Sequence, residues 1–154
     1  MKTALVITAA GLMSFGTAGI TPAAAYHLSP ESTSFTGSGN TSATKNGVSL
    51  PCKASFTGHV DSNGVGWVDS GTFTGQVGCS TVGLQNLPWK SLARSAKKVT
   101  IFNVTFTSPI GNCGPSKLPV KLVNGVITFN TVPISGGCTV SGKITTTPAL
   151  SIVP

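Results

Sequence analysis

The sequence has 154 residues, of which 40% are hydrophobic and only 8% are charged, and its formal net charge is +7. This hydrophobic fraction excludes an intrinsically disordered chain, and 3 acidic residues leave little material for paired-carboxylate catalysis. The many Ser, Thr and β-branched residues instead predict an all-β domain with a weakly charged surface.

Residues 1–25 have the pattern of a secretory signal peptide. Lys2 precedes an apolar run over 4–20, and the small residues 23–25 form an A-x-A cleavage site. We expect cleavage after Ala25 and one secreted domain over residues 26–154, with cell-surface association or periplasmic retention as alternatives. A membrane anchor is disfavoured because the run is short and rich in Gly, Ala and Thr.

All four cysteines follow the predicted cleavage site: Cys52, Cys79, Cys113 and Cys138. An even number in a small exported domain predicts two disulfides. Since none of the spacings is C-x-x-C, the pattern argues against a zinc or thioredoxin-like site.

Alternation of apolar and polar residues predicts a long, half-buried strand over residues 48–60. Its predicted core face carries Val48, Leu50, Cys52, Ala54, Phe56 and Val60. Segments 73–79 and 138–144 place cysteines on an apolar face in the same way. Asn46-Gly47 and Asn63-Gly64 are candidate turns on either side of the long strand.

A spacing of cysteine, ten residues and Asn-Gly-Val occurs twice, beginning at Cys52 and at Cys113. Each copy continues to a Gly-Cys pair, which ends in Cys79 or Cys138. No reactive residue is repeated with them, so we interpret the repeat as a folding unit used twice. This favours the pairs Cys52–Cys79 and Cys113–Cys138 among the three pairings that four cysteines allow.

Residues 89–98 have two interpretations. Apolar residues at helical spacing favour a short amphipathic helix, whereas the surrounding β pattern favours an extended segment, which we prefer. The segment is strongly basic, which is typical of a surface that meets anionic lipid, polysaccharide or nucleic acid. A solubilising edge is the alternative, and we expect no specific nucleic-acid binding. The candidate surface-binding residues are Trp89, Lys90, Arg94, Lys97 and Lys98.

Residues 99–106 alternate as a strand, and Asn124-Gly125 is the strongest hairpin signal of the chain, because Asn-Gly supplies the two positive φ angles of a type I′ turn. The resulting register places Val123 opposite Val126, Leu122 opposite Ile127, Val120 opposite Phe129, and Leu118 opposite Thr131.

Candidates for catalysis are weak. His59 and Asp61 share one face of a predicted strand, but two such residues do not make a metal or catalytic site. The remaining candidates, His27, Glu31 and Asp69, have no recognisable spacing, and no G-x-S-x-G motif is present. We therefore expect no catalytic residues, no metal and no cofactor, and we keep an unrecognised hydrolase only as a third alternative.

Several short motifs resemble the PraA/PraB family of small secreted bacterial proteins, which are described as activators of alkane oxidation. The motifs lie at residues 46–52, 87–89, 108–115, 126–130 and 137–142. The resemblance implies an exported protein that helps cells to use hydrophobic substrate without oxidising it. It supplies no catalytic residue that maps onto this sequence.

The sequence thus predicts an all-β antiparallel sandwich or partly closed barrel with two disulfides. With the resemblance, it predicts a secreted, non-enzymatic protein that promotes alkane oxidation or uptake at an oil–water or cell–substrate interface. The alternative function is that of a cell-surface or matrix protein that supports biofilm formation by adhesion or self-association through exposed strand edges.

Overall fold

The computed structural model describes residues 25–154, so the predicted signal peptide lies outside the described residues except for Ala25. The elements are β1 (His27–Ser29), β2 (Thr33–Lys45), β3 (Val48–Val60), β4 (Gly66–Gly75), a short 3₁₀ helix η1 (Cys79–Thr81), β5 (Gly83–Gln85), β6 (Trp89–Ala93), β7 (Lys98–Thr107), β8 (Cys113–Val123), β9 (Val126–Ile134), β10 (Cys138–Thr147) and β11 (Ser151–Val153). The predicted all-β class is confirmed.

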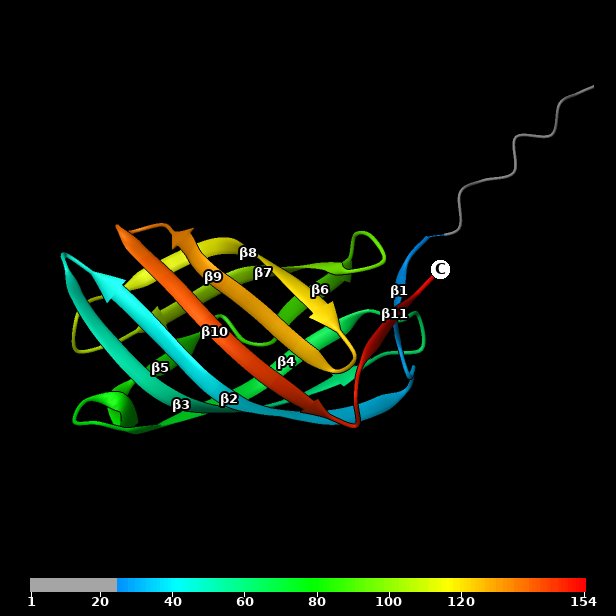
Figure 1. Cartoon of the computed structure of the whole chain (residues 1–154), viewed down its shortest axis with the longest axis horizontal. Coiled ribbons are helices and arrows are strands. Elements are labelled where there is room, and N and C mark those ends of the chain that lie inside the picture. The colour runs from blue at the N-terminus through cyan, green and yellow to red at the C-terminus, as the bar shows by residue number, and fades with distance from the viewer. Residues whose placement is uncertain (1–24) are drawn as a thin grey trace, which may run out of the picture.

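Eight strands close into an antiparallel barrel, shown in Figure 1. The order around the barrel is β7, β6, β4, β3, β2, β10, β9, β8, and β8 pairs again with β7. Strand β5 pairs with β7 beyond the end of β6, while β1 and β11 form a separate two-stranded ribbon at one end of the barrel (Figure 1). The sequence left a sandwich and a partly closed barrel open, and the structure is a barrel.

The long strand predicted over residues 48–60 is β3. Its inner face buries Leu50, Cys52, Ala54 and Val60, as the alternation indicates. Val48, which the pattern assigned to the same face, is 54% exposed, because it lies at the strand end beside the Asn46-Gly47 turn.

Three phenylalanine rings lie over glycines on the inner wall. A Cβ atom built on Gly58, Gly71 or Gly142 would stand less than 3 Å from the rings of Phe35, Phe56 and Phe129, respectively. Each ring occupies the space that a side chain at the glycine would need, so a larger residue at any of these glycines would displace the ring.

The Asn124-Gly125 turn is formed as predicted, with φ angles of 48° and 76°. Val123 pairs with Val126 and Leu122 with Ile127, but the ladder between β8 and β9 ends one pair later, at Lys121 and Thr128. The two predicted pairs beyond it, Val120–Phe129 and Leu118–Thr131, are not formed.

Prolines explain why this ladder stops. Pro115 and Pro119 in β8 and Pro133 in β9 have no N–H to donate, so a continuous ladder between the two strands lacks donors. Thr131, at φ 49°, also interrupts the extended backbone of β9. Strand β8 instead pairs along β7, which closes the barrel.

Both predicted disulfides are present, with Cα–Cα distances of 5.7 Å for Cys52–Cys79 and 5.9 Å for Cys113–Cys138. The second members of the pairs have different surroundings, because Cys79 begins η1 whereas Cys138 begins β10. The spacing thus predicted the pairing correctly, although the two halves differ in local structure.

The preferred extended interpretation of residues 89–98 is confirmed. Strand β6 ends at Ala93, and a tight turn, in which Arg94 N–H donates to Lys98 O at 2.8 Å, leads into β7. Every second residue of β6 therefore faces outward, and the helical face of the alternative interpretation does not exist.

Candidate functional site

Four of the five candidate surface residues lie together on the outside of the barrel. Lys90 belongs to β6, Arg94 and Lys97 to the following turn, and Lys98 to the start of β7, and all four are exposed. Two further lysines join them from β8: Lys121, which lies directly opposite Lys98, and Lys117. We call the set Lys90, Arg94, Lys97, Lys98, Lys117 and Lys121 the basic face.

Sequence reasoning missed Lys117 and Lys121 because they are about twenty residues away along the chain. A signal was present, since both alternate with the buried Leu118, Val120 and Leu122 and must therefore point outward. What the sequence did not contain was the pairing of β8 with β7.

An aromatic ring lies within the basic face. Phe102, on the outer side of β7, has the Arg94 guanidinium 5.4 Å and the Lys117 ammonium 5.6 Å from its ring centroid. Both distances are within the range of cation–π attraction. The ring therefore holds two cations from separate elements at one place on the surface.

No carboxylate neutralises the basic face from within its own strands. The acidic residues are Glu31, Asp61 and Asp69, and the segment 90–121 contains none of them. Glu31 and Asp61 belong to the β1–β2 connection and the β3–β4 loop, whereas Asp69 belongs to β4, which pairs with β6 through Trp67 and Lys90. The β6–β7 turn, β7 and β8 carry the other five cations of the basic face and no acid, and this local positive potential attracts anionic surfaces.

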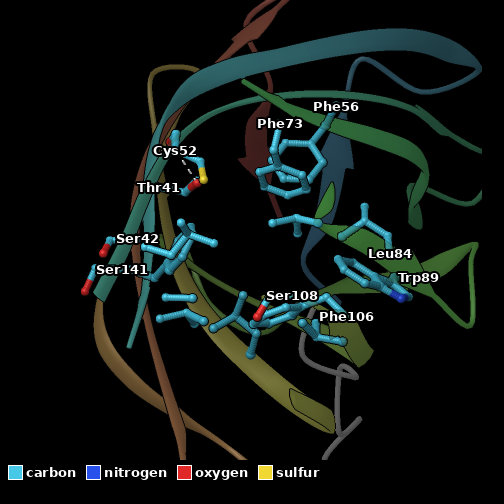
Figure 2. Close-up of a pocket in the computed structure, with 17 residues that line it drawn as sticks. Thr41, Ser42, Cys52, Phe56, Phe73, Leu84, Trp89, Phe106, Ser108 and Ser141 are labelled. Carbon is cyan, nitrogen blue, oxygen red and sulfur yellow. Dashed lines mark hydrogen bonds between the residues drawn. The ribbon is translucent and has the colours of Figure 1, made fainter. Parts of the chain in front are cut away.

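Trp89, the fifth candidate surface residue, points inward. It is 5% exposed, and its indole N–H donates to Gln85 O at 2.7 Å. Its ring lies in the barrel interior and lines two cavities there, of about 90 and 100 Å³, the first of which is shown in Figure 2. The structure thus separates Trp89 from the basic residues that follow it in the sequence.

Comparison with known families now identifies the chain. A family model described as "Alkane oxidation protein activator PraA/PraB-like" matches residues 1–154, the whole chain. The chain belongs to this family. The resemblance inferred from the short motifs is therefore confirmed, whereas neither curated proteins nor solved structures gave a significant match.

The family is described as one of activators, and the polar clusters of this PraA/PraB-like protein are simple surface pairs. His59 Nδ1 lies 2.7 Å from Asp69 Oδ2, so its ion-pair partner is Asp69 and not Asp61, and its ring stacks on Trp67. His27 pairs with Glu31 at 3.0 Å. Among residues 25–154, no group of three His, Cys, Asp or Glu lies close enough to hold a metal ion.

Asp61 organises the loop between β3 and β4. Its carboxylate accepts hydrogen bonds from the backbone N–H groups of Val65 and Asn63 and from the Trp67 indole. The bond from Val65, followed by that from Trp67, lowers the pKa of Asp61 below the usual value for a carboxyl group. Asp61 therefore closes a loop, and Asn63-Gly64 belongs to this longer connection and not to a two-residue hairpin.

Within the part of the chain that the structure describes, no helix has the length and apolar character needed to cross a membrane.

Proposed function

We propose that this PraA/PraB-like protein is a secreted, non-enzymatic factor that promotes alkane oxidation or uptake by acting where hydrocarbon meets the cell surface. The observation that carries the proposal is the one-sided charge of the barrel. Six cations gather on β6, β7, β8 and the β6–β7 turn, and the remaining outer surface is rich in hydroxyl groups and poor in charge. A positive face supports attachment to an anionic cell envelope, and a charge-poor face costs less to desolvate against oil than a charged face does.

The available donor set supports a non-enzymatic role. Alkane oxidation requires an oxygen-activating metal or organic cofactor. The chain has 2 histidines, and all four cysteines are in disulfides. His27 and His59 pair with different carboxylates, so the strongest ligands are not gathered at one place. In our proposal, the oxidation is carried out by enzymes of the cell.

Export is part of the proposal. Two buried disulfides are typical of an oxidising compartment, and cleavage after Ala25 would leave β1 intact, since it begins at His27. Intact-mass analysis of culture supernatant, before and after reduction and alkylation, should give a chain starting at Tyr26 with no thiol that reacts before reduction. Secreted protein that retains Met1 would contradict the cleavage, and a reactive thiol would contradict the oxidised state.

The function is tested on cells and on hexadecane alone. Purified protein added to a strain that lacks its own copy should increase the rate of hexadecane consumption, with no effect on growth on a soluble carbon source. The protein mixed with hexadecane in the absence of cells should yield no oxidised product. Oxidised product without cells would show that the protein is an enzyme.

The adhesive alternative makes a different prediction in the same strain. Closure of the barrel leaves strand edges unpaired chiefly where the β8–β9 and β4–β6 ladders are interrupted, which limits assembly by strand addition. A biofilm defect on every carbon source, together with no stimulation of hexadecane consumption, would support the alternative and reject the interface role.

A further inference from the structure

The barrel interior contains two adjoining cavities. One, of about 90 Å³, lies toward the Cys52–Cys79 disulfide and is bounded there by Leu50 and Cys52. The other, of about 100 Å³, lies toward the β1–β11 ribbon and is bounded by Leu28 and Leu150. The same four residues line both cavities: Phe56, Trp89, Leu118 and Phe129. The cavities therefore adjoin in the interior space of the barrel, and the four shared side chains form the constriction between them.

The walls of this space are apolar, as the side chains in Figure 2 illustrate. Most of the polar groups on the walls already have partners within the protein. Thr41 donates to Cys52 O, Thr146 donates to Gly125 O and accepts from Leu150 N–H, and the Trp89 N–H is bound to Gln85 O. The buried Ser91 hydroxyl, in the second cavity, is an exception. An apolar space with so few free polar groups holds water poorly and binds apolar molecules instead.

The size of the cavities discriminates between shapes of ligand. An engineered protein cavity of about 150 Å³ holds one benzene molecule. Each cavity here is smaller than that, so neither takes an aromatic ring without rearrangement. A flexible, unbranched chain can occupy both by passing the constriction, because its cross-section is that of a single methylene group.

Two strand ladders are interrupted beside the barrel interior. Pairing between β8 and β9 ends at Lys121 and Thr128, and pairing between β4 and β6 ends at Val68 and Trp89. Leu118 and Phe129 line the interior where the β8–β9 ladder is interrupted. Phe73 and Leu84 line it where the β4–β6 ladder is interrupted. Each interruption thus adjoins apolar side chains of the cavity walls.

We propose that the barrel interior is a binding site for an unbranched alkyl chain, either that of an n-alkane or that of a fatty acid. The cavities and their apolar walls are independent of the function proposed above, but the choice of alkyl chain rests on it. Each methylene group buried contributes about 0.8 kcal/mol, which is about fourfold in affinity. Affinity should therefore rise about fourfold per added carbon until the space is filled, and then level off.

Trp89 provides a direct probe of occupancy, because it lines both cavities and the chain has only one other tryptophan. In a Trp67→Phe background, 1-bromooctane should quench the fluorescence of Trp89 saturably, since bromine quenches on contact, while aqueous iodide should not reach the ring. Dose curves for 1-bromobutane, 1-bromohexane and 1-bromooctane should show the rise in affinity with length. The anion 8-bromooctanoate tests the fatty-acid source; quenching by the neutral chain alone would assign the site to alkanes.

Filling the cavities separates interior binding from surface binding. Ala43→Leu narrows the first cavity and Ser91→Leu the second, and each should weaken 1-bromooctane binding about tenfold or more, as expected for the exclusion of two or more methylenes. Ala96→Leu is the matched control, because Ala96 is exposed on the β6–β7 turn, and it should bind as the unsubstituted protein does. Unchanged binding in both filled variants would overturn the proposal.

If a cavity-filling variant does not fold, a competition experiment on the Trp67→Phe protein takes its place. In the Trp67→Phe protein, n-octane should reverse the quenching by 1-bromooctane, while benzene at equal activity should not. Quenching that does not saturate, or that octane does not reverse, would overturn interior binding. This failure is distinguishable from failure of the proposed function. If the protein does not bind 1-bromooctane but still stimulates hexadecane consumption, only the interior site is rejected. If it binds 1-bromooctane but does not stimulate consumption, only the cellular role is rejected.

Discussion

Removal of the Cys113–Cys138 disulfide, by changing both cysteines to alanine, should lower the free energy of unfolding by about 2–5 kcal/mol, the range for a small disulfide-bonded domain. Cys113 and Cys138 are 1% and 2% exposed, and both belong to the main core. Equilibrium denaturation in urea, with and without the substitutions, measures the loss. A smaller loss than 1 kcal/mol would show that this link is not needed to hold the barrel together.

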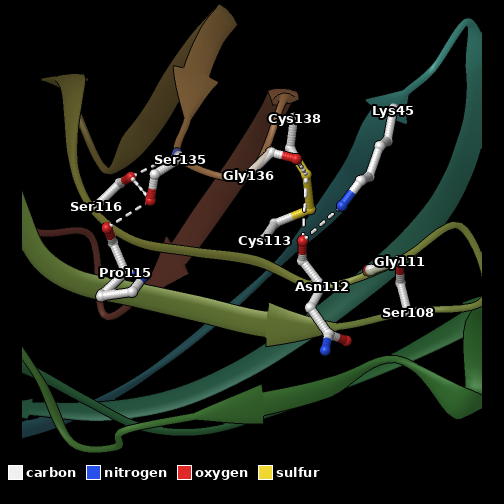
Figure 3. The surroundings of a disulfide bond; sticks show 10 residues. All are labelled: Lys45, Ser108, Gly111, Asn112, Cys113, Pro115, Ser116, Ser135, Gly136 and Cys138. Carbon is white, nitrogen blue, oxygen red and sulfur yellow. Dashed lines mark hydrogen bonds between the residues drawn. A yellow bond between two sulfur atoms is a disulfide. The ribbon is translucent and has the colours of Figure 1, made fainter.

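The position of this disulfide explains why its effect should be large. Strands β8 and β9 pair only next to the Asn124-Gly125 turn, so their far ends depend on other contacts. There the disulfide joins the start of β8 to the start of β10, and hydrogen bonds join Ser116 of β8 to Ser135 in the β9–β10 turn, as Figure 3 shows. Loss of the disulfide should therefore loosen a place where the backbone ladder is already missing.

The Cys52–Cys79 disulfide is the matched control, because it closes a loop of similar length. It belongs to a small separate cluster with Leu50, and it lies beside the β3–β4 ladder, which has nine residue pairs. Chain entropy alone predicts nearly equal losses for the two disulfides. We expect the Cys113–Cys138 variant to be the less stable, and equal losses would contradict the importance of the interrupted ladder.

Replacing Lys98 and Lys121 by glutamine should weaken binding to anionic lipid vesicles about 30-fold at 0.01 M salt. Each lysine near an anionic surface contributes roughly 1 kcal/mol, and at this ionic strength charges interact over a Debye length of about 30 Å. The two lysines lie directly opposite each other on β7 and β8, so both meet a surface that touches the basic face. Vesicle co-sedimentation measures the affinity.

The control removes the same charge from elsewhere on the barrel. Lys53 on β3 and Lys143 on β10 lie on strands across the barrel from β8 and β6, and their replacement by glutamine should change binding little. Equal weakening in both double variants would mean that net charge alone governs adsorption. Neither variant should unfold at lower denaturant concentration, because exposed charges contribute little to stability and like charges opposite one another disfavour pairing.

Much of the fold follows from local features of the sequence. Period-two alternation placed β3 to the residue, because a strand with one buried face must repeat every two residues. The Asn124-Gly125 turn follows from its two positive φ angles, and the disulfide pairing from the repeated spacing of the cysteines. These are short-range constraints, which the chain carries whatever surrounds it.

The candidate site depends on contacts that are distant in sequence. Alternation shows that a side chain points to one side of a strand, but not which strand lies beside it or what covers that side. Lys117 and Lys121 join the basic face only because β8 pairs with β7, and Trp89 faces the interior only because the sheet closes into a barrel. The sequence by itself determined strands with clear alternation such as β3 and β7, the Asn124-Gly125 turn and the disulfide pairing. The tertiary structure alone decided the closure, the cavities and the composition of the basic face, because each arises from the register between segments far apart in the chain.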